Sequence, residues 1–178
     1  MNKILLSAED TQIRLGISTI SGTATFEDAY GNTSQDFDLN DGSGLEVSFV
    51  FGVNKSDGFD FRSALTLQSN EVTIGRNLDT SDIMLLGEYE LAYKINEYIT
   101  PFVGFYGGVG ATDIPDVDET GLLTYDLGFL LGVSGEIYKD LGYYAKYSIG
   151  MKGYNSEDDV VGIRQNPTSM KFGVSYTF

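Results

Sequence analysis

The chain ends in SMKFGVSYTF, residues 169–178, and this stretch alternates strictly between two kinds of side chain. One parity carries Met170, Phe172, Val174, Tyr176 and Phe178; the other carries Ser169, Lys171, Gly173 and Ser175. Successive side chains of a β-strand point to opposite faces. The period of two therefore predicts a strand that separates an apolar environment from a polar one.

The same alternation recurs along the chain. It is found in residues 12–19, 44–53, 59–68, 83–94, 125–137 and 143–152. No Asp, Glu, Lys or Arg falls on the apolar parity of these segments or of the last one. The segment 98–109 is ambiguous, because Phe102 and Tyr106 fall on the polar parity. Counted with it, the sequence predicts eight strands.

The connections between these segments alternate in length. Short turns are expected at 54–58, 94–97 and 139–142, and longer polar loops at 20–41, 70–82, 110–122 and 153–167. This pattern predicts an all-β, eight-stranded antiparallel up-and-down barrel that occupies residues 10–178 as one domain. Residues 1–9 are interpreted either as the remnant of a secretory signal or as a disordered start, because only three apolar residues follow Lys3.

Alternation alone does not say which face of the barrel is apolar, but three features favour an apolar exterior. The polar parity is rich in Gly and Ser, which suit the narrow interior of an eight-stranded barrel. Its charges nearly balance, as a confined interior requires. Aromatic residues collect near the short turns, as at a membrane interface. A transmembrane barrel is therefore preferred over a soluble, lipocalin-like barrel with its apolar face inside.

We expect the charged side chains of the polar parity to form a network inside the barrel. They are Arg14, Glu46, Asp60, Arg62, Glu88, Glu90, Asp126, Glu136, Lys146, Lys152 and Lys171. The four long loops hold fifteen acids and only Arg76 and Arg164 as bases, so most of the net charge of −15 is expected there.

Two stretches resemble a known family. The terminal strand, with Phe172, Val174, Tyr176 and Phe178, resembles the last strand of bacterial outer-membrane proteins, which ends in an aromatic residue that the assembly machinery reads. The stretch Tyr98–Gly104 resembles a strand start of the small OmpA-like and OmpX-type barrels. The resemblance implies an integral protein of the bacterial outer membrane with eight transmembrane strands and no periplasmic domain after Phe178.

Composition limits the chemistry. The chain has no His and no Cys, so the commonest general base and any thiolate site are absent. A net charge of −15 argues against nucleic acid as a partner. Glu88 and Glu90 share one parity, but salt bridges to Arg14, Arg62 or Lys171 explain such a pair better than acid–base catalysis. We expect neither an enzyme nor a cofactor.

Two acidic stretches come close to a calcium-binding loop without completing one. Asp36 and Asp38 lie in DFDLNDG, whose Gly arrives one residue late; Asp116 and Asp118 lie in DVDETG, where position 12 is Leu127 instead of Glu. We expect weak cation binding at most and no tight metal site.

The sequence thus predicts a monomeric outer-membrane barrel with a structural or surface-binding role through acidic extracellular loops and a lumen plugged by charged side chains. Expected partners are outer-membrane lipids, lipopolysaccharide, the barrel assembly machinery and an unidentified extracellular ligand. A narrow pore for small solutes and a soluble ligand carrier are the alternatives.

Overall fold

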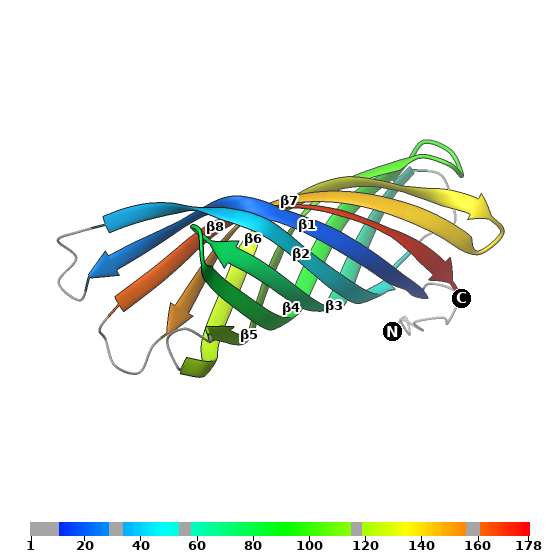
Figure 1. The fold of residues 1–178 in the computed structure, drawn as a ribbon. Helices are drawn as coiled ribbons and strands as arrows, with labels where there is room; N and C mark the ends of the chain where they lie inside the picture. Colours follow the sequence, from blue (N-terminus) through cyan, green and yellow to red (C-terminus); the bar gives the residue numbers. More distant parts are fainter. Residues whose placement is uncertain (1–10, 29–33, 54–57, 115–118, 156–160) are drawn as a thin grey trace, which may run out of the picture.

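The computed structural model describes residues 11–28, 34–53, 58–114, 119–155 and 161–178, which form a single closed barrel (Figure 1). The part of the chain that it describes has no helix long and apolar enough to cross a membrane. The strands are β1 (Thr11–Asp28), β2 (Ser34–Phe51), β3 (Gly58–Ile74), β4 (Leu78–Lys94), β5 (Thr100–Ile114), β6 (Glu119–Tyr138), β7 (Leu141–Asn155) and β8 (Val161–Thr177). The prediction of an eight-stranded antiparallel barrel is confirmed.

Every strand pairs with its neighbours in the chain, and β1 closes the barrel against β8. The cross-strand pairs that start at Thr11 pass once around the barrel and return to β1 at Ser21, so the strands are staggered by ten residues (21 − 11). Such a stagger means that the strands are tilted, by about 40° in barrels of this size. Closure leaves no free sheet edge along the middle of the barrel.

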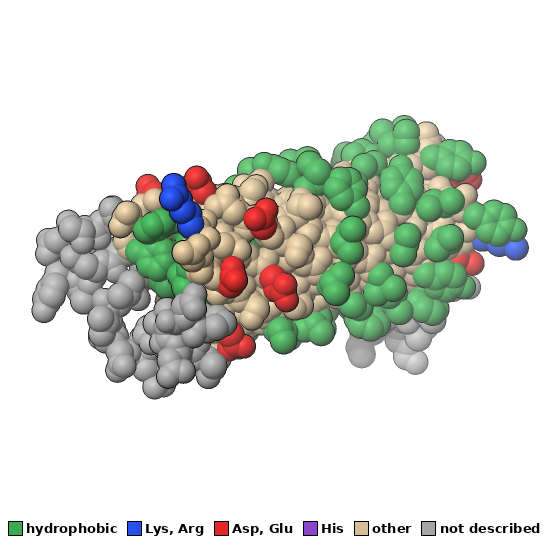
Figure 2. Space-filling view, viewed as in Figure 1, with side chains coloured by type: hydrophobic (Ala, Val, Ile, Leu, Met, Phe, Trp, Pro, Cys, Tyr) green, Lys and Arg blue, Asp and Glu red, His purple; other side chains and the backbone are tan. Residues whose placement is uncertain are grey.

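We call the end with the β2–β3, β4–β5 and β6–β7 connections the turn end, and the opposite end the loop end. The C-terminus lies at the turn end, on the right in Figure 1. The exterior toward the turn end is covered by exposed apolar side chains (Figure 2). Phe61 and Phe129 are the most exposed of them, at 79% and 76%. The apolar parity therefore faces outward, which excludes the lipocalin-like arrangement.

The expected long loops are largely wrong, because the strands continue into them. The β3 and β4 strands together cover all of residues 70–82 except a turn at Gly75, Arg76 and Asn77. The β1 and β2 strands likewise cover most of 20–41, so only 29–33 lies outside the described residues there. Strand hydrogen bonds do not depend on which face is apolar, so a change of side-chain pattern does not mark the end of a strand.

The polarity of the barrel wall reverses toward the loop end of β1–β4. Here apolar side chains point inward and polar ones outward, the opposite of the arrangement near the turn end. We call the inward cluster the apolar cap; it consists of Ile20, Ala24, Leu39, Val72 and Ile74, with Phe26, Phe37 and Leu78 packed against it. A polar exterior over an apolar interior is the arrangement of a water-exposed sheet.

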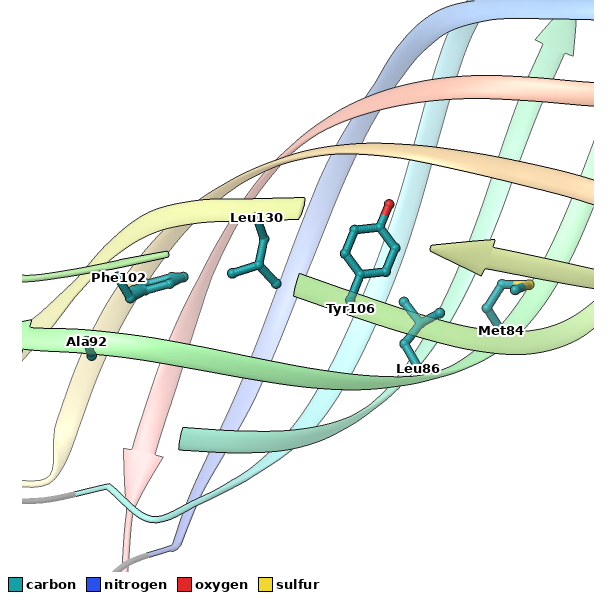
Figure 3. Packing of buried hydrophobic residues seen from close by; sticks show 6 residues of the cluster. All are labelled: Met84, Leu86, Ala92, Phe102, Tyr106 and Leu130. Atoms are coloured by element: carbon teal, nitrogen blue, oxygen red, sulfur yellow. The ribbon is translucent and has the colours of Figure 1, made fainter. Parts of the chain in front are cut away.

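The ambiguous strand β5 resolves into an inward row of aromatic side chains. Phe102 and Tyr106 are buried in the lumen, where they pack with Met84, Leu86 and Leu130 from β4 and β6 (Figure 3). Each ring lies opposite a glycine of β6: Phe102 pairs with Gly132, and Tyr106 with Gly128. A Cβ at Gly132 would collide with the Phe102 ring, and a Cβ at Gly128 would meet the Tyr106 hydroxyl. Glycine thus provides the space that lets aromatic side chains fill the lumen.

Candidate functional site

The barrel lumen is the candidate site, because it concentrates nearly all of the buried charge. Among the described residues, the buried ionisable side chains with formal charge are six acids and five bases, namely Glu46, Asp60, Asp82, Glu88, Glu90, Asp126, Arg14, Arg62, Lys146, Lys152 and Lys171. Ten of these eleven residues are predicted from the sequence. The eleventh, Asp82, falls in an expected loop, because the alternation predicts that β4 begins after it.

Arg14 and Glu90 form a two-pronged ion pair across the lumen. The two terminal guanidinium nitrogens of Arg14 donate to the carboxylate oxygens of Glu90 at 2.6 and 3.1 Å, and both side chains are fully buried. The Nε of Arg14 donates to Gln12 at 2.9 Å. The guanidinium also lies 5.5 and 5.4 Å from the ring centres of Phe102 and Tyr144. Planar hydrogen bonding and ring contacts of this kind are specific to arginine.

A second group joins four strands through shared carboxylates. Lys146 Nζ lies 2.9 Å from both oxygens of Glu88 and 3.4 Å from Glu46. Lys171 Nζ lies 2.9 Å from the other oxygen of Glu46. The hydroxyl of Tyr144 donates to Glu46 at 2.8 Å. Each of these carboxylates therefore has several partners, as buried charges require.

A third chain of contacts runs across the lumen nearer the loop end. Lys152 Nζ lies 2.6 Å from Asp82, which accepts a hydrogen bond from Asn70 at 2.8 Å. Gln68 donates to Asn70 at 2.7 Å and accepts from Lys171 at 2.6 Å. This chain of contacts crosses the interior and links Lys152 to Lys171, which belongs to the second group.

At the turn end, the lumen opens into a shallow polar mouth. Arg62 Nε lies 2.8 Å from Asp60, and an Arg62 terminal nitrogen donates to Ser134 at 3.3 Å. Glu136 lines the same mouth but is only half-buried, so it lies at the end of the lumen and not in its centre.

Outside the strands, the hydrogen bond that Tyr98 makes with Glu97, together with the negative charge of Glu97, raises the pKa of the Tyr98 phenol.

Between the ion pairs and the apolar cap lies a small internal cavity of about 20 Å³. Its lining includes Asp126, Gln165 and the cap residues Ile20 and Val72. Asp126 Oδ1 and Gln165 Nε2 are buried without a protein hydrogen-bond partner. A cavity of this size holds about one water molecule, and a water needs such polar partners. The space suits a water and nothing larger.

Three residues of the predicted assembly signal lie on the outer face of β8, and the fourth, Phe178, follows its last residue. Phe172, Val174, Tyr176 and Phe178 are each about half exposed, at 49, 49, 48 and 51%. The rings of Tyr176 and Phe178 pack edge to face with centres 5.1 Å apart. Recognition of this strand by the assembly machinery stays a prediction.

The first acidic near-motif is not shaped as an ion-binding loop. Asp36 and Asp38 lie on extended strand β2, and Asp36 accepts a hydrogen bond from Thr25 at 2.7 Å. A strand spaces alternate residues about 6.6 Å apart, so it does not wrap an ion. Asp116 and Asp118 lie outside the described residues. No three His, Cys, Asp or Glu residues in the described ranges are grouped to hold a metal.

Sequence comparisons identify no relative, since no protein-family model and no curated protein matches the chain significantly. Solved structures are similar in fold. Neisserial surface protein A aligns over 97% of this chain and 98% of its own, with a TM-score of 0.63 and 15% identity. The outer membrane protein OprG from Pseudomonas aeruginosa aligns over 96% of both chains, with a TM-score of 0.54 and 14% identity. Ail, the attachment invasion locus protein of Yersinia pestis, covers 96% of this chain and 99% of its own, with a TM-score of 0.50 and 13% identity.

Likeness at such low identity concerns the fold, and the membrane environment follows from the exterior. A barrel whose outer wall carries a continuous apolar band, and whose polar groups and ion pairs lie inside, has the polarity required in lipid. The chain is therefore an integral β-barrel of the bacterial outer-membrane type.

Proposed function

We propose that this barrel is a sealed outer-membrane protein with a structural or surface-binding role, and that it neither conducts solutes nor catalyses a reaction. The observation that carries the proposal is the filled lumen. Five basic and six acidic side chains occupy it, and the cavity that lies among them has about the volume of one water molecule. The apolar cap adds a second barrier toward the loop end.

Reconstitution into planar bilayers tests the seal. The wild-type barrel should insert without giving discrete conductance steps. A variant that shortens the side chains across the lumen, Arg14→Ala with Glu90→Ala and Phe102→Ala, should conduct if it still folds. Its boiled and unboiled forms on a gel would show whether the barrel is closed. Steady conductance by the wild type would instead support the narrow pore.

The surface role is supported by charge at the loop end. Six exposed acids lie on described strands there, against the exposed bases Arg76 and Arg164; the acids are Asp36, Asp38, Asp41, Glu71, Asp79 and Asp113. Such a rim repels anionic lipopolysaccharide phosphates unless divalent cations bridge them. We propose weak, distributed binding of calcium or magnesium at this rim, with lipopolysaccharide as the neighbouring partner.

Amide hydrogen exchange in detergent tests this cation effect. Millimolar calcium should slow exchange at the loop ends of β2–β4 relative to a chelator. A variant with Asp36→Asn, Asp38→Asn and Asp41→Asn should lose most of the difference, whereas Asp140→Asn at the turn end should retain it. Equal exchange with calcium and chelator would remove cation binding and leave the sealed barrel untouched.

The terminal strand supports a further part of the proposal, namely that the assembly machinery reads Phe172, Val174, Tyr176 and Phe178. Phe178→Ala should lower the amount inserted in cells while leaving refolding in detergent nearly unchanged. Thr177→Ala, which alters the other parity, is the matched control. Equal losses in cells and in detergent would show a folding defect instead of a lost signal.

A further inference from the structure

The apolar band is much taller on one side of the barrel than on the other. On β6 the outward apolar side chains run from Leu123 to Ile137, fourteen residues apart (137 − 123). On β3 they run from Phe59 to Leu67, only eight residues apart (67 − 59). With tilted strands, each residue advances about 2.5 Å along the barrel axis. The band is therefore about 35 Å tall on β6 and about 20 Å on β3.

The difference lies at the loop end and not at the turn end. Because the stagger is ten residues, each move from a residue to its cross-strand partner, in the order β1 to β8, shifts the position by about 3 Å along the barrel axis toward the loop end. Measured from Thr11 along the axis, Phe59 and Ile137 both lie about 5 Å toward the turn end. At the loop end, the band stops at Ile17 on β1, about 15 Å from Thr11 along the axis. On β6 it continues to Leu123, about 30 Å from Thr11 in the same direction.

Polar side chains occupy the outer wall where the band is missing. On β8, β1, β2 and β3, just beyond the last apolar position, the outward residues are Thr168, Thr19, Ser21, Ser43, Ser69 and Glu71. At the same level, β4–β6 present Ile83, Val109 and Tyr125, which are 61, 57 and 44% exposed. Figure 2 shows the apolar side chains ending part-way along the face that carries β1 and β2, and acids beyond them.

We propose that this polar wall of β8, β1, β2 and β3 contacts lipid headgroups, so that the loop-side leaflet is locally thinned along it. A flat bilayer that covers Leu123 would also place the carboxylate of Glu71 and the hydroxyls of Ser21 and Ser43 in hydrocarbon. Charged groups on the lipid face are costly there, whereas deforming the bilayer costs only fractions of a kcal/mol per ångström. Tilting the whole barrel does not remove the conflict, because the band ends at the same height on β3 and β6 at the turn end and differs only at the loop end.

Single tryptophans test this directly, because the chain contains none. Ser21 and Tyr125 lie at the same level, about 25 Å from Thr11. In phosphatidylcholine vesicles with brominated acyl chains, Tyr125→Trp should be quenched at least threefold more than Ser21→Trp. Acrylamide in the water should quench Ser21→Trp more. Equal quenching by the brominated chains would overturn the proposal, and so would a Ser21→Trp shielded from both quenchers, which indicates a protein partner.

A second experiment keeps the wild-type aromatic residues. The variant Thr19→Leu, Ser21→Leu and Ser43→Leu extends the apolar band on the short side. The measurement is the urea concentration at the midpoint of unfolding, in vesicles of increasing acyl-chain length. It should be highest in the shorter lipids for the wild type and in longer lipids for the variant. The control variant Thr19→Asn, Ser21→Asn and Ser43→Asn should behave as the wild type. An unchanged optimum in the leucine variant would contradict the local thinning.

Discussion

Buried charge is tolerated in this lumen because acidic and basic side chains are paired there, some of them with several partners. Arg14 is the clearest case, with an ion pair to Glu90, a hydrogen bond to Gln12 and two aromatic rings beside its guanidinium. Removing one member of a buried pair leaves the other uncompensated, whereas removing both does not. The lumen should therefore be more sensitive to a single substitution than to a matched double one.

The Arg14–Glu90 pair allows this to be measured. Arg14→Met and Glu90→Met should each lower the free energy of unfolding by about 3–5 kcal/mol, because each leaves a buried charge alone. The double variant should recover part of the loss. Urea unfolding of all four proteins in one lipid gives the coupling energy. Additive losses would mean that the two side chains contribute independently.

An arginine introduced on the outer face should be destabilising, because its charge has no partner in lipid. Phe129→Arg places a charge near the middle of the apolar band and should cost about 2–4 kcal/mol of unfolding free energy in vesicles. Thr23→Arg, on the outer face of β1 beyond the band, should cost little. Equal losses for the two variants would show that position 129 does not face lipid.

At the scale of strands, glycine and aromatic residues form matched pairs across neighbouring strands. Tyr106 of β5 lies over Gly128 and Gly150 on β6 and β7, and a Cβ at Gly150 would meet the Tyr106 hydroxyl. Tyr144 of β7 likewise lies over Gly16 and Gly173 on β1 and β8. These contacts fill the interior without widening the barrel, and they fix the register of adjacent strands.

A double-mutant cycle tests one such contact. Gly150→Ala should destabilise the barrel by about 1–3 kcal/mol through overpacking. The loss should be smaller in a Tyr106→Phe background, because the hydroxyl that the new methyl group meets is gone. Gly87→Ala is a suitable control, since a methyl group added at Gly87 would come no closer than 3.8 Å to its nearest neighbour, a backbone oxygen. An unchanged loss in the Tyr106→Phe background would mean that other contacts dominate.

The strands also show what alternation predicts and where it fails. It locates all eight strands, because no charge interrupts the outward parity in the apolar band. It does not place Phe102 and Tyr106, since an aromatic residue can pack inside a barrel as well as face lipid. It misses Asp82 because the polarity of the wall reverses there. The sequence offers Arg14 as one of three candidate partners of Glu90 but does not choose among them, because the two residues are 76 positions apart.

For the whole molecule, closure and lumen packing together predict resistance to denaturation. Every strand of the band is paired on both sides, so unfolding in detergent must break a continuous ladder. The folded protein should remain closed in SDS until it is boiled, and boiled and unboiled samples should migrate differently on a gel. Identical migration of a refolded sample would argue against the closed barrel.

In this barrel the apolar parity faces lipid and the polar parity fills the interior. Two phenylalanines of β5 test it most directly, because Phe105 is 55% exposed on the outside and Phe102 is 2% exposed in the lumen. In vesicles with brominated acyl chains, Phe105→Trp should be strongly quenched and Phe102→Trp barely affected, with aqueous acrylamide reaching neither readily. Strong quenching of Phe102→Trp with protection of Phe105→Trp would show that the two faces are assigned the wrong way round.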